Sequence, residues 1–114
     1  MRFNKLGRTN MHVSEVGLGC EHLQNKDSLV IKNTIDKALF HGINLLDVFM
    51  SQPQIRTDIG QALKGKRSDV MIQAHIGSTW SDNQYVRSRD LNQCHLFFED
   101  YMRRLQTDYL DIGM

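Results

Sequence analysis

The feature that most constrains the fold of this chain is the alternation of apolar strand patterns with helical patterns. Residues 43–49 are nearly continuous in apolar side chains, as expected for a parallel strand buried on both faces, and residues 70–76 give a further strand. Between them, isoleucine and leucine recur every four positions over 55–63, which is the spacing of one helix face. Three strand–helix units followed by a strand at 109–114 predict an α/β fold with a parallel sheet.

The N-terminal part of the chain carries two shorter patterns. A turn at residues 7–10 lies between two apolar stretches and predicts a hairpin over residues 3–13. A short strand at 15–19 follows and ends in glycine. Asp27 or Ser28 then offers an N-cap for a helix, and Gly42 lies where a left-handed residue would end it.

The region after the strand at 70–76 divides into a polar part and a helical part. Residues 78–89 are polar and predict a long loop or an irregular turn, in which Trp80 and Tyr85 either line a substrate pocket or pack on the rim of the fold. Asp90 is the expected N-cap of the next helix. Its apolar stripe predicts the buried face, formed by Leu91, Cys94, Phe98, Met102 and Leu105.

Composition narrows the classes of protein that remain. The chain has 114 residues, a formal net charge of +1 and 40% hydrophobic residues, which suits one domain over 1–114 and gives no strong attraction to nucleic acid or anionic membranes. No apolar stretch is long enough to span a bilayer, and no secretory signal precedes the hairpin. Cys20 and Cys94 are far apart and form no C-x-x-C pair, so reduced thiols in a cytoplasmic protein are expected.

The pattern alone is compatible with half of a barrel and with a small doubly wound sheet. The strand at 109–114 has no helix after it to cover its apolar side chains. The sequence therefore predicts either a part of a larger barrel or a protomer that buries this surface against a partner.

Four segments of the chain carry a recognisable pattern: residues 3–9 followed by 13–19, residues 41–47, residues 59–65 and residues 103–111. In order and spacing they resemble the opening, the second strand, the second helix and the junction of the third helix with the fourth strand of the aldo-keto reductases. Together the four matches extend over essentially the whole chain. The resemblance implies a partial TIM (β/α)8 barrel, in which an N-terminal β-hairpin precedes (β/α)3β4.

The resemblance also implies an NADPH-dependent reductase of aldehydes or ketones without a Rossmann unit. His22 stands where the third glycine of a dinucleotide fingerprint would fall, so that fingerprint is absent. The family places the residues after the first strand and the aspartate of the second strand beside the nicotinamide. The corresponding cofactor-binding residues here are Gly19, Cys20, Glu21 and Asp47.

The catalytic residues implied by the family are only partly present. Asp47 matches the family aspartate, whereas Gln52 occupies the position of the tyrosine and His75 that of the lysine. The family histidine would fall just beyond Met114. Asp47 and His75 end neighbouring strands, so they are the predicted catalytic residues, since an Asp–His pair supplies general acid chemistry near neutral pH.

Other interpretations of the same residues remain open. His75 also fits a partly buried histidine bonded to backbone, and Asp47 fits a structural carboxylate. Cys20, Glu21 and His22 could be combined with that pair as metal ligands, but their spacing matches no standard zinc pattern, and we expect no metal.

Two functions from different classes follow from these expectations. The first is the initial half of an oxidoreductase acting on a small-molecule carbonyl, which would bind NADPH weakly on its own and need a C-terminal half for turnover. The second is a non-catalytic binding or assembly module, such as a homodimer of half-barrels. A third interpretation gives the His75 variant an altered redox chemistry in a longer protein, with electrons supplied by another domain.

Overall fold

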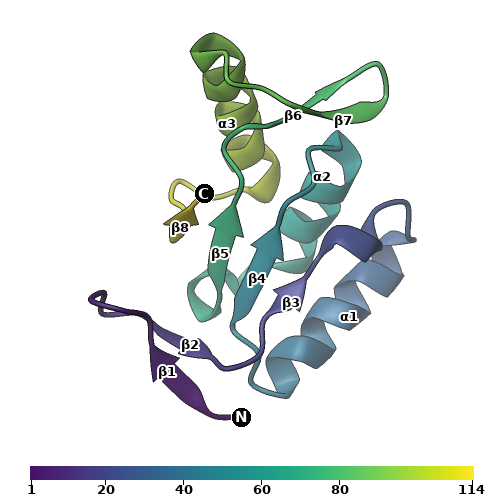
Figure 1. Ribbon diagram of the computed structural model, residues 1–114. Helices are drawn as coiled ribbons and strands as arrows, with labels where there is room; N and C mark the ends of the chain where they lie inside the picture. The colour runs from purple at the N-terminus through teal and green to yellow at the C-terminus, as the bar shows by residue number, and fades with distance from the viewer.

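A computed structural model describes all 114 residues, and it contains the predicted parallel sheet. Four strands lie in the order β3-β4-β5-β8, and every neighbouring pair is parallel. Three helices cover one face of this sheet, while the other face is open (Figure 1). The elements are β1 Phe3–Lys5, β2 His12–Ser14, β3 Leu18–Gly19, η1 Glu21–Leu23, α1 Ser28–Phe40, β4 Leu45–Val48, α2 Pro53–Ala62, η2 Arg67–Asp69, β5 Met71–Ala74, β6 Ser78–Ser81, β7 Gln84–Arg87, α3 Leu91–Leu105 and β8 Ile112–Gly113.

The core lies between the sheet and the helices. Alternate residues of a strand face opposite sides, so β4 turns Leu46 and Val48 toward the helices and Leu45 and Asp47 toward the open face. Sixteen buried residues form one cluster, and the helix positions at 55, 59 and 63 belong to it as predicted. No helix has the length and apolar character needed to cross a membrane.

The helix boundaries follow from local signals in the sequence. The Asp27 carboxylate accepts a hydrogen bond from the backbone N–H of Leu29 at 2.8 Å and caps α1. Asp90 caps α3 in the same way, through the N–H of Gln93 at 2.9 Å. Gly42 has φ of +84°, a left-handed conformation that glycine adopts without strain, and α1 ends just before it.

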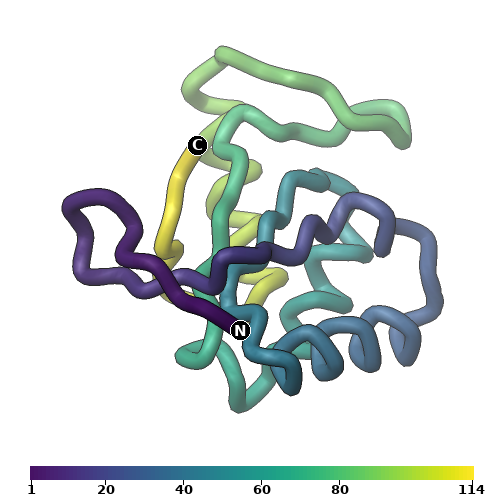
Figure 2. Tube along the Cα trace, turned by 60° about the horizontal axis from the view of Figure 1, so that its bottom comes forward, coloured from purple at the N-terminus to yellow at the C-terminus, as the bar shows by residue number.

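Two antiparallel hairpins lie at opposite ends of the sheet (Figures 1 and 2). The predicted N-terminal hairpin is confirmed: β1 pairs with β2 near the amino ends of the parallel strands. The prediction of a long loop at 78–89 is wrong, since β6 pairs with β7 at the carboxyl end. Asp82 and Asn83 both have positive φ, as the two-residue turn of a tight hairpin requires.

Two further expectations needed correction. The strands are shorter than the apolar patterns suggest: the strand expected at 109–114 pairs with β5 only at Ile112 and Gly113. The apolar stripe of α3 is also displaced. Leu91 is 84% exposed, and Phe98 and Met102 are half-buried, whereas Tyr101 and Leu105 are the residues that the helix buries.

Arg67 holds the last strand in place. Its guanidinium forms an ion pair with Asp111 at 2.8 Å, donates to the carbonyls of Val70 and Tyr109, and lies over the Tyr109 ring. The same Asp111 oxygen accepts the N–H of Ile72 at 2.9 Å. These contacts join the loop before β8 to the start of β5, so β8 has a fixed position despite its length.

Candidate active site on the open face of the sheet

The structure brings Asp47 and His75 together on the open face, near the carboxyl ends of β4 and β5. The Nε2 of His75 lies 3.0 Å from Oδ1 of Asp47. The His75 side chain is 27% exposed and the Asp47 side chain 40% exposed, so both are accessible to a ligand. The predicted proximity of these residues is therefore present, at the end of the sheet where barrel enzymes place their chemistry.

Hydrogen bonding fixes the state of the imidazole in this pair. A carboxylate accepts hydrogen bonds, so the contact favours the tautomer in which the Nε2–H of His75 donates a hydrogen bond to Oδ1 of Asp47. Nδ1 of His75 has no hydrogen-bond partner in the protein. Nδ1 is therefore the ring nitrogen that is left free to exchange a proton with a ligand.

Gln73 is a third member of the site that the sequence analysis did not identify. It is the direct neighbour of Asp47 in the register between β4 and β5, and its Nε2 donates to Asp47 Oδ1 at 3.1 Å. The sequence feature that could have identified Gln73 is its polarity in an otherwise apolar strand, two positions before His75. Oδ2 of Asp47 has no partner and remains available.

An aromatic wall borders the imidazole. The Phe49 ring meets the His75 ring edge-on, with centroids 5.0 Å apart, and its other side lies against Tyr85, with centroids 4.9 Å apart. Tyr85 belongs to the β6–β7 hairpin, opposite Trp80 in its register. Of the two aromatic residues predicted to line a pocket or pack on the rim, Tyr85 thus lies close to the site.

The residues expected beside the nicotinamide have different environments. Gly19 is exposed, it pairs with Asp47 in the sheet, and no atom lies within 4 Å of the place a side chain would occupy there. Glu21 is also exposed, in η1. Cys20 is fully buried and belongs to the core, where burial, and then the charge of Asp47, raises the pKa of its thiol to about 12.

Gln52 does not join the site. Its side-chain amide donates to Oδ1 of Asn25 at 2.8 Å, in the connection between η1 and α1, and its backbone precedes α2. No group of three or more histidine, cysteine, aspartate or glutamate side chains converges to form a metal site. Cys20, Glu21 and His22 therefore do not combine with the Asp47–His75 pair as ligands.

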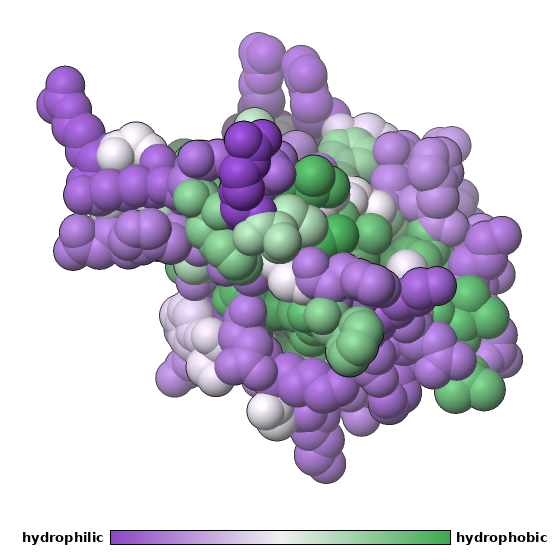
Figure 3. Space-filling view, turned by 90° about the horizontal axis from the view of Figure 1, so that it is seen from below, coloured by the Kyte–Doolittle hydropathy of each residue, from purple (hydrophilic) through white to green (hydrophobic).

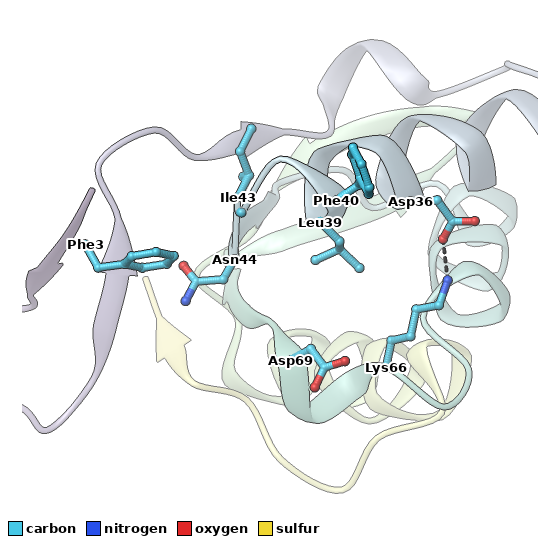
Figure 4. Close-up of a pocket in the computed structure, with 9 residues that line it drawn as sticks. Phe3, Asp36, Leu39, Phe40, Ile43, Asn44, Lys66 and Asp69 are labelled. Carbon is cyan, nitrogen blue, oxygen red and sulfur yellow. Dashed lines mark hydrogen bonds and ion pairs between the residues drawn. The ribbon is translucent and has the colours of Figure 1, made fainter. Parts of the chain in front are cut away.

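A hollow with a volume of about 600 Å³ lies at the opposite, amino-terminal end of the sheet. Seen from below, apolar surface occupies the middle of this face and hydrophilic surface surrounds it (Figure 3). Phe3 and Phe40 approach the hollow from β1 and α1, while Asp36 and Lys66 pair across one side (Figure 4).

Chemistry in this hollow is not favoured by its residues. Hydrogen bonds from Lys32 and Lys66 hold the pKa of Asp36 below its ordinary value, so this carboxylate is a paired structural group. The hollow contains no histidine or cysteine. We therefore place the candidate active site at the Asp47–His75 pair.

Comparison with known proteins shows which proteins the chain resembles as a whole. No protein-family model matches the chain. Over 98% of its length, however, it is 30% identical to the uncharacterized oxidoreductase YqkF of Bacillus subtilis. It also superposes on the holo form of the aldo-keto reductase AKR11C1 from Bacillus halodurans with a TM-score of 0.87 and 31% identity, over 99% of the chain.

Nearly the whole chain is thus similar, in sequence and in structure, to part of the aldo-keto reductases. It spans 38% of the length of YqkF and 39% of the Bacillus halodurans structure. An aldo-keto reductase from Klebsiella pneumoniae solved in complex with NADPH shares the fold at a TM-score of 0.69 and 22% identity, with 90% of this chain and 34% of that one covered. The four-stranded sheet is thus a partial reductase barrel, as the sequence predicted.

Proposed function

We propose that this chain, as part of an aldo-keto reductase, supplies the proton-donating side of a nicotinamide-dependent carbonyl reduction. The observation that carries the proposal is the 3.0 Å contact between Nε2 of His75 and Oδ1 of Asp47 on the open face. It gives the chain an acid–base pair although the family tyrosine and lysine positions hold Gln52 and His75.

The reaction needs a proton at a defined place. A carbonyl carbon that accepts hydride from a reduced nicotinamide leaves the former π electrons on its oxygen, which then takes up one proton to complete the alcohol. Protonated His75 donates this proton from Nδ1 and returns to the neutral form. Asp47 keeps the ring oriented and stabilises its charge before the transfer, and Phe49 and Tyr85 exclude water from one side.

The residues present fit a nicotinamide close to β3. The space above Gly19 is free, and Gly19 is the sheet neighbour of Asp47, so a flat ring placed there would lie beside the acid–base pair. When bound, NADPH would supply the hydride. Gly19, the exposed part of Asp47 and Glu21 would border it, whereas the buried thiol of Cys20 would not contact it.

The choice of NADPH as the cofactor rests on similar proteins of known structure and is part of the proposal. The Klebsiella pneumoniae neighbour holds NADPH and the Bacillus halodurans neighbour is a holo form, which supports the family cofactor. Each of those chains is more than twice as long as this one, so weak NADPH binding by these 114 residues alone stays a prediction.

Substitutions of the pair test the proposal in the protein as it occurs naturally. We expect His75→Gln to lower kcat for NADPH-dependent reduction of an aldehyde about 100-fold, because the amide still bonds Asp47 but transfers no proton. Asp47→Asn is expected to act in the same direction. The measurement is NADPH oxidation across an aldehyde panel, with deuterium transfer from labelled cofactor to product as confirmation.

Gln73→Leu is the matched control for these variants. It removes one neutral hydrogen bond to Asp47 and no proton donor, so we expect a loss of less than about tenfold. Unchanged turnover in both His75→Gln and Asp47→Asn would contradict the proposal. An equal loss in Gln73→Leu and His75→Gln would show that His75 only orients the carboxylate.

A second candidate function is a non-catalytic assembly module, and the free edges of the sheet favour it. Strands β3 and β8 each pair on one side only, and the open face carries apolar side chains. Two copies joined edge to edge would complete the pairing. In that case light scattering of the 114-residue chain gives a molar mass twice the 13.2 kDa of one chain. A mass of 13.2 kDa at all concentrations excludes the homodimer.

A further inference from the structure

Buried polar residues are concentrated beside the candidate site. The chain has five of them, and four lie where α2, α3 and β6 meet near the carboxyl end of the sheet (Figure 1). Arg56 is the largest and is 1% exposed. A buried charge is costly unless hydrogen bonds compensate for it, so its contacts call for an explanation. The four residues are Ser51, Arg56, Ser78 and Thr79.

Arg56 has no carboxylate partner and bonds three backbone carbonyls instead. Its Nε donates to Met50 O at 2.9 Å, and the two terminal nitrogens donate to Phe97 O at 3.2 Å and Ser78 O at 3.3 Å. Its Cζ lies 4.6 Å from the centroid of the Tyr101 ring. Burial lowers the pKa of Arg56 to about 10, so the side chain still carries its charge at neutral pH.

These three carbonyls belong to three different segments. Met50 lies in the connection from β4 to α2, Ser78 begins the β6–β7 hairpin, and Phe97 is in α3. Only a planar fork with several fixed donors can reach them together, which distinguishes arginine from lysine. Arg56 thus determines how the loop after Asp47 and the hairpin after His75 lie relative to each other.

A short path of contacts leads from this arrangement to the imidazole. The Ser78 hydroxyl donates to Phe49 O at 2.7 Å, and the Ser51 hydroxyl donates to Thr79 O at 2.6 Å, so the loop and the hairpin are also bonded directly. The Phe49 ring then contacts His75 edge-on. Moving the loop by a fraction of an ångström therefore moves the ring that borders the imidazole.

We propose that Arg56 is a positioning residue, which fixes the β4–α2 loop against the β6–β7 hairpin so that Phe49 keeps His75 oriented toward Asp47. Its importance for catalysis rests on the proposed function above. The structural part of the proposal is independent of that function, because it concerns only the orientation of the His75 ring, whether or not the chain turns over a substrate.

The test compares Arg56→Lys with the unchanged chain by NMR. Lysine keeps the charge but cannot reach the three carbonyls, so we expect the ring-proton resonances of His75 to shift as Phe49 moves. We also expect the Ser88 amide, which bonds Gly77 O and closes the hairpin, to exchange with solvent roughly tenfold faster. Fluorescence of Trp80, the single tryptophan, reports the same loosening.

Arg67→Lys is a matched control from the same chain. Arg67 also donates to backbone carbonyls and lies over a tyrosine ring, but it holds the segment before β8. We expect it to accelerate amide exchange near residues 107–113 and to leave the Ser88 amide and the Trp80 fluorescence unchanged. Identical His75 and hairpin signals in Arg56→Lys and in the unchanged chain would overturn the proposal.

Ser78→Ala keeps the test decisive if Arg56→Lys does not fold. It removes only the hydroxyl that bonds Phe49 O, and the carbonyl that Arg56 uses remains. A shift of the His75 resonances in this variant supports the proposal, and their constancy overturns it. Since no turnover is measured, failure of this test is distinguishable from failure of the reductase proposal.

Discussion

Replacing Gly60 with alanine is expected to lower the free energy of unfolding by about 3 kcal/mol. A Cβ at this position would lie 2.3 Å from the carbonyl oxygen of Arg104 and 2.9 Å from Cα of Leu105. Both atoms are backbone of the end of α3, so no side-chain rotation relieves the overlap. α2 and α3 must separate, and the contacts that bury Leu105 and Ile59 weaken as they do.

Steric overlap and helix propensity predict opposite effects of Gly60→Ala on stability, so the measurement distinguishes them. Alanine favours a helix interior over glycine by up to about 1 kcal/mol, so propensity alone predicts stabilisation. Urea unfolding followed by circular dichroism measures the difference. Gln61→Ala is the matched control: it is the next residue of the same helix, its side chain is exposed, and we expect a change within about 0.5 kcal/mol. A neutral or stabilising Gly60→Ala would show that the two helices are not in close contact.

Leu46→Ala is expected to cost about 3 kcal/mol of unfolding free energy through a different mechanism. Leu46 is fully buried in β4, next to Leu18 on one side and Ile72 on the other in the sheet register. Truncation removes apolar contacts between the sheet and the helices and leaves a cavity. β4 lies between β3 and β5, so its neighbours cannot move into the space without breaking backbone pairing.

Leu45→Ala provides the comparison in the same strand. Leu45 is adjacent to Leu46 but faces the open side of the sheet, where it is only half-buried. The same atoms are deleted, so any difference between the two variants reports the environment rather than the residue type. We expect the loss for Leu45→Ala to be smaller by about 2 kcal/mol, measured as a shift of the urea midpoint. Equal losses would mean that the two faces are equally covered.

Much of the parallel sheet could be predicted because its signals are local and periodic. The apolar stretch containing Leu46, the four-residue repeat of Ile55 and Ile59 and the capping residues Asp27 and Asp90 all act within one turn or one strand. The β6–β7 hairpin was missed because its turn, Asp82-Asn83, lacks the glycine that commonly marks such turns, and its strands are mostly polar. Its position depends on tertiary contacts made by Ser78 and Thr79.

The site was predictable only where topology alone decides proximity. Asp47 and His75 end neighbouring parallel strands, so their meeting follows from strand order. The buried thiol of Cys20 and the contact between Phe49 and Tyr85 depend on side-chain direction in short loops, which periodicity does not give. Arg56 was missed because an arginine on a helix is usually exposed, and only the carbonyls brought together by folding make its burial favourable.

The separation of the two ends of the sheet has a consequence for how the sequence can change over evolutionary time. A strand as short as β4 spans about 13 Å, which exceeds the Debye length of about 8 Å at physiological ionic strength. Exchanging the sign of an exposed charge near Asp36 therefore barely alters the electric potential at the imidazole. Natural variation near Asp36 can therefore adjust heat resistance or solubility with little change in the electric potential at His75.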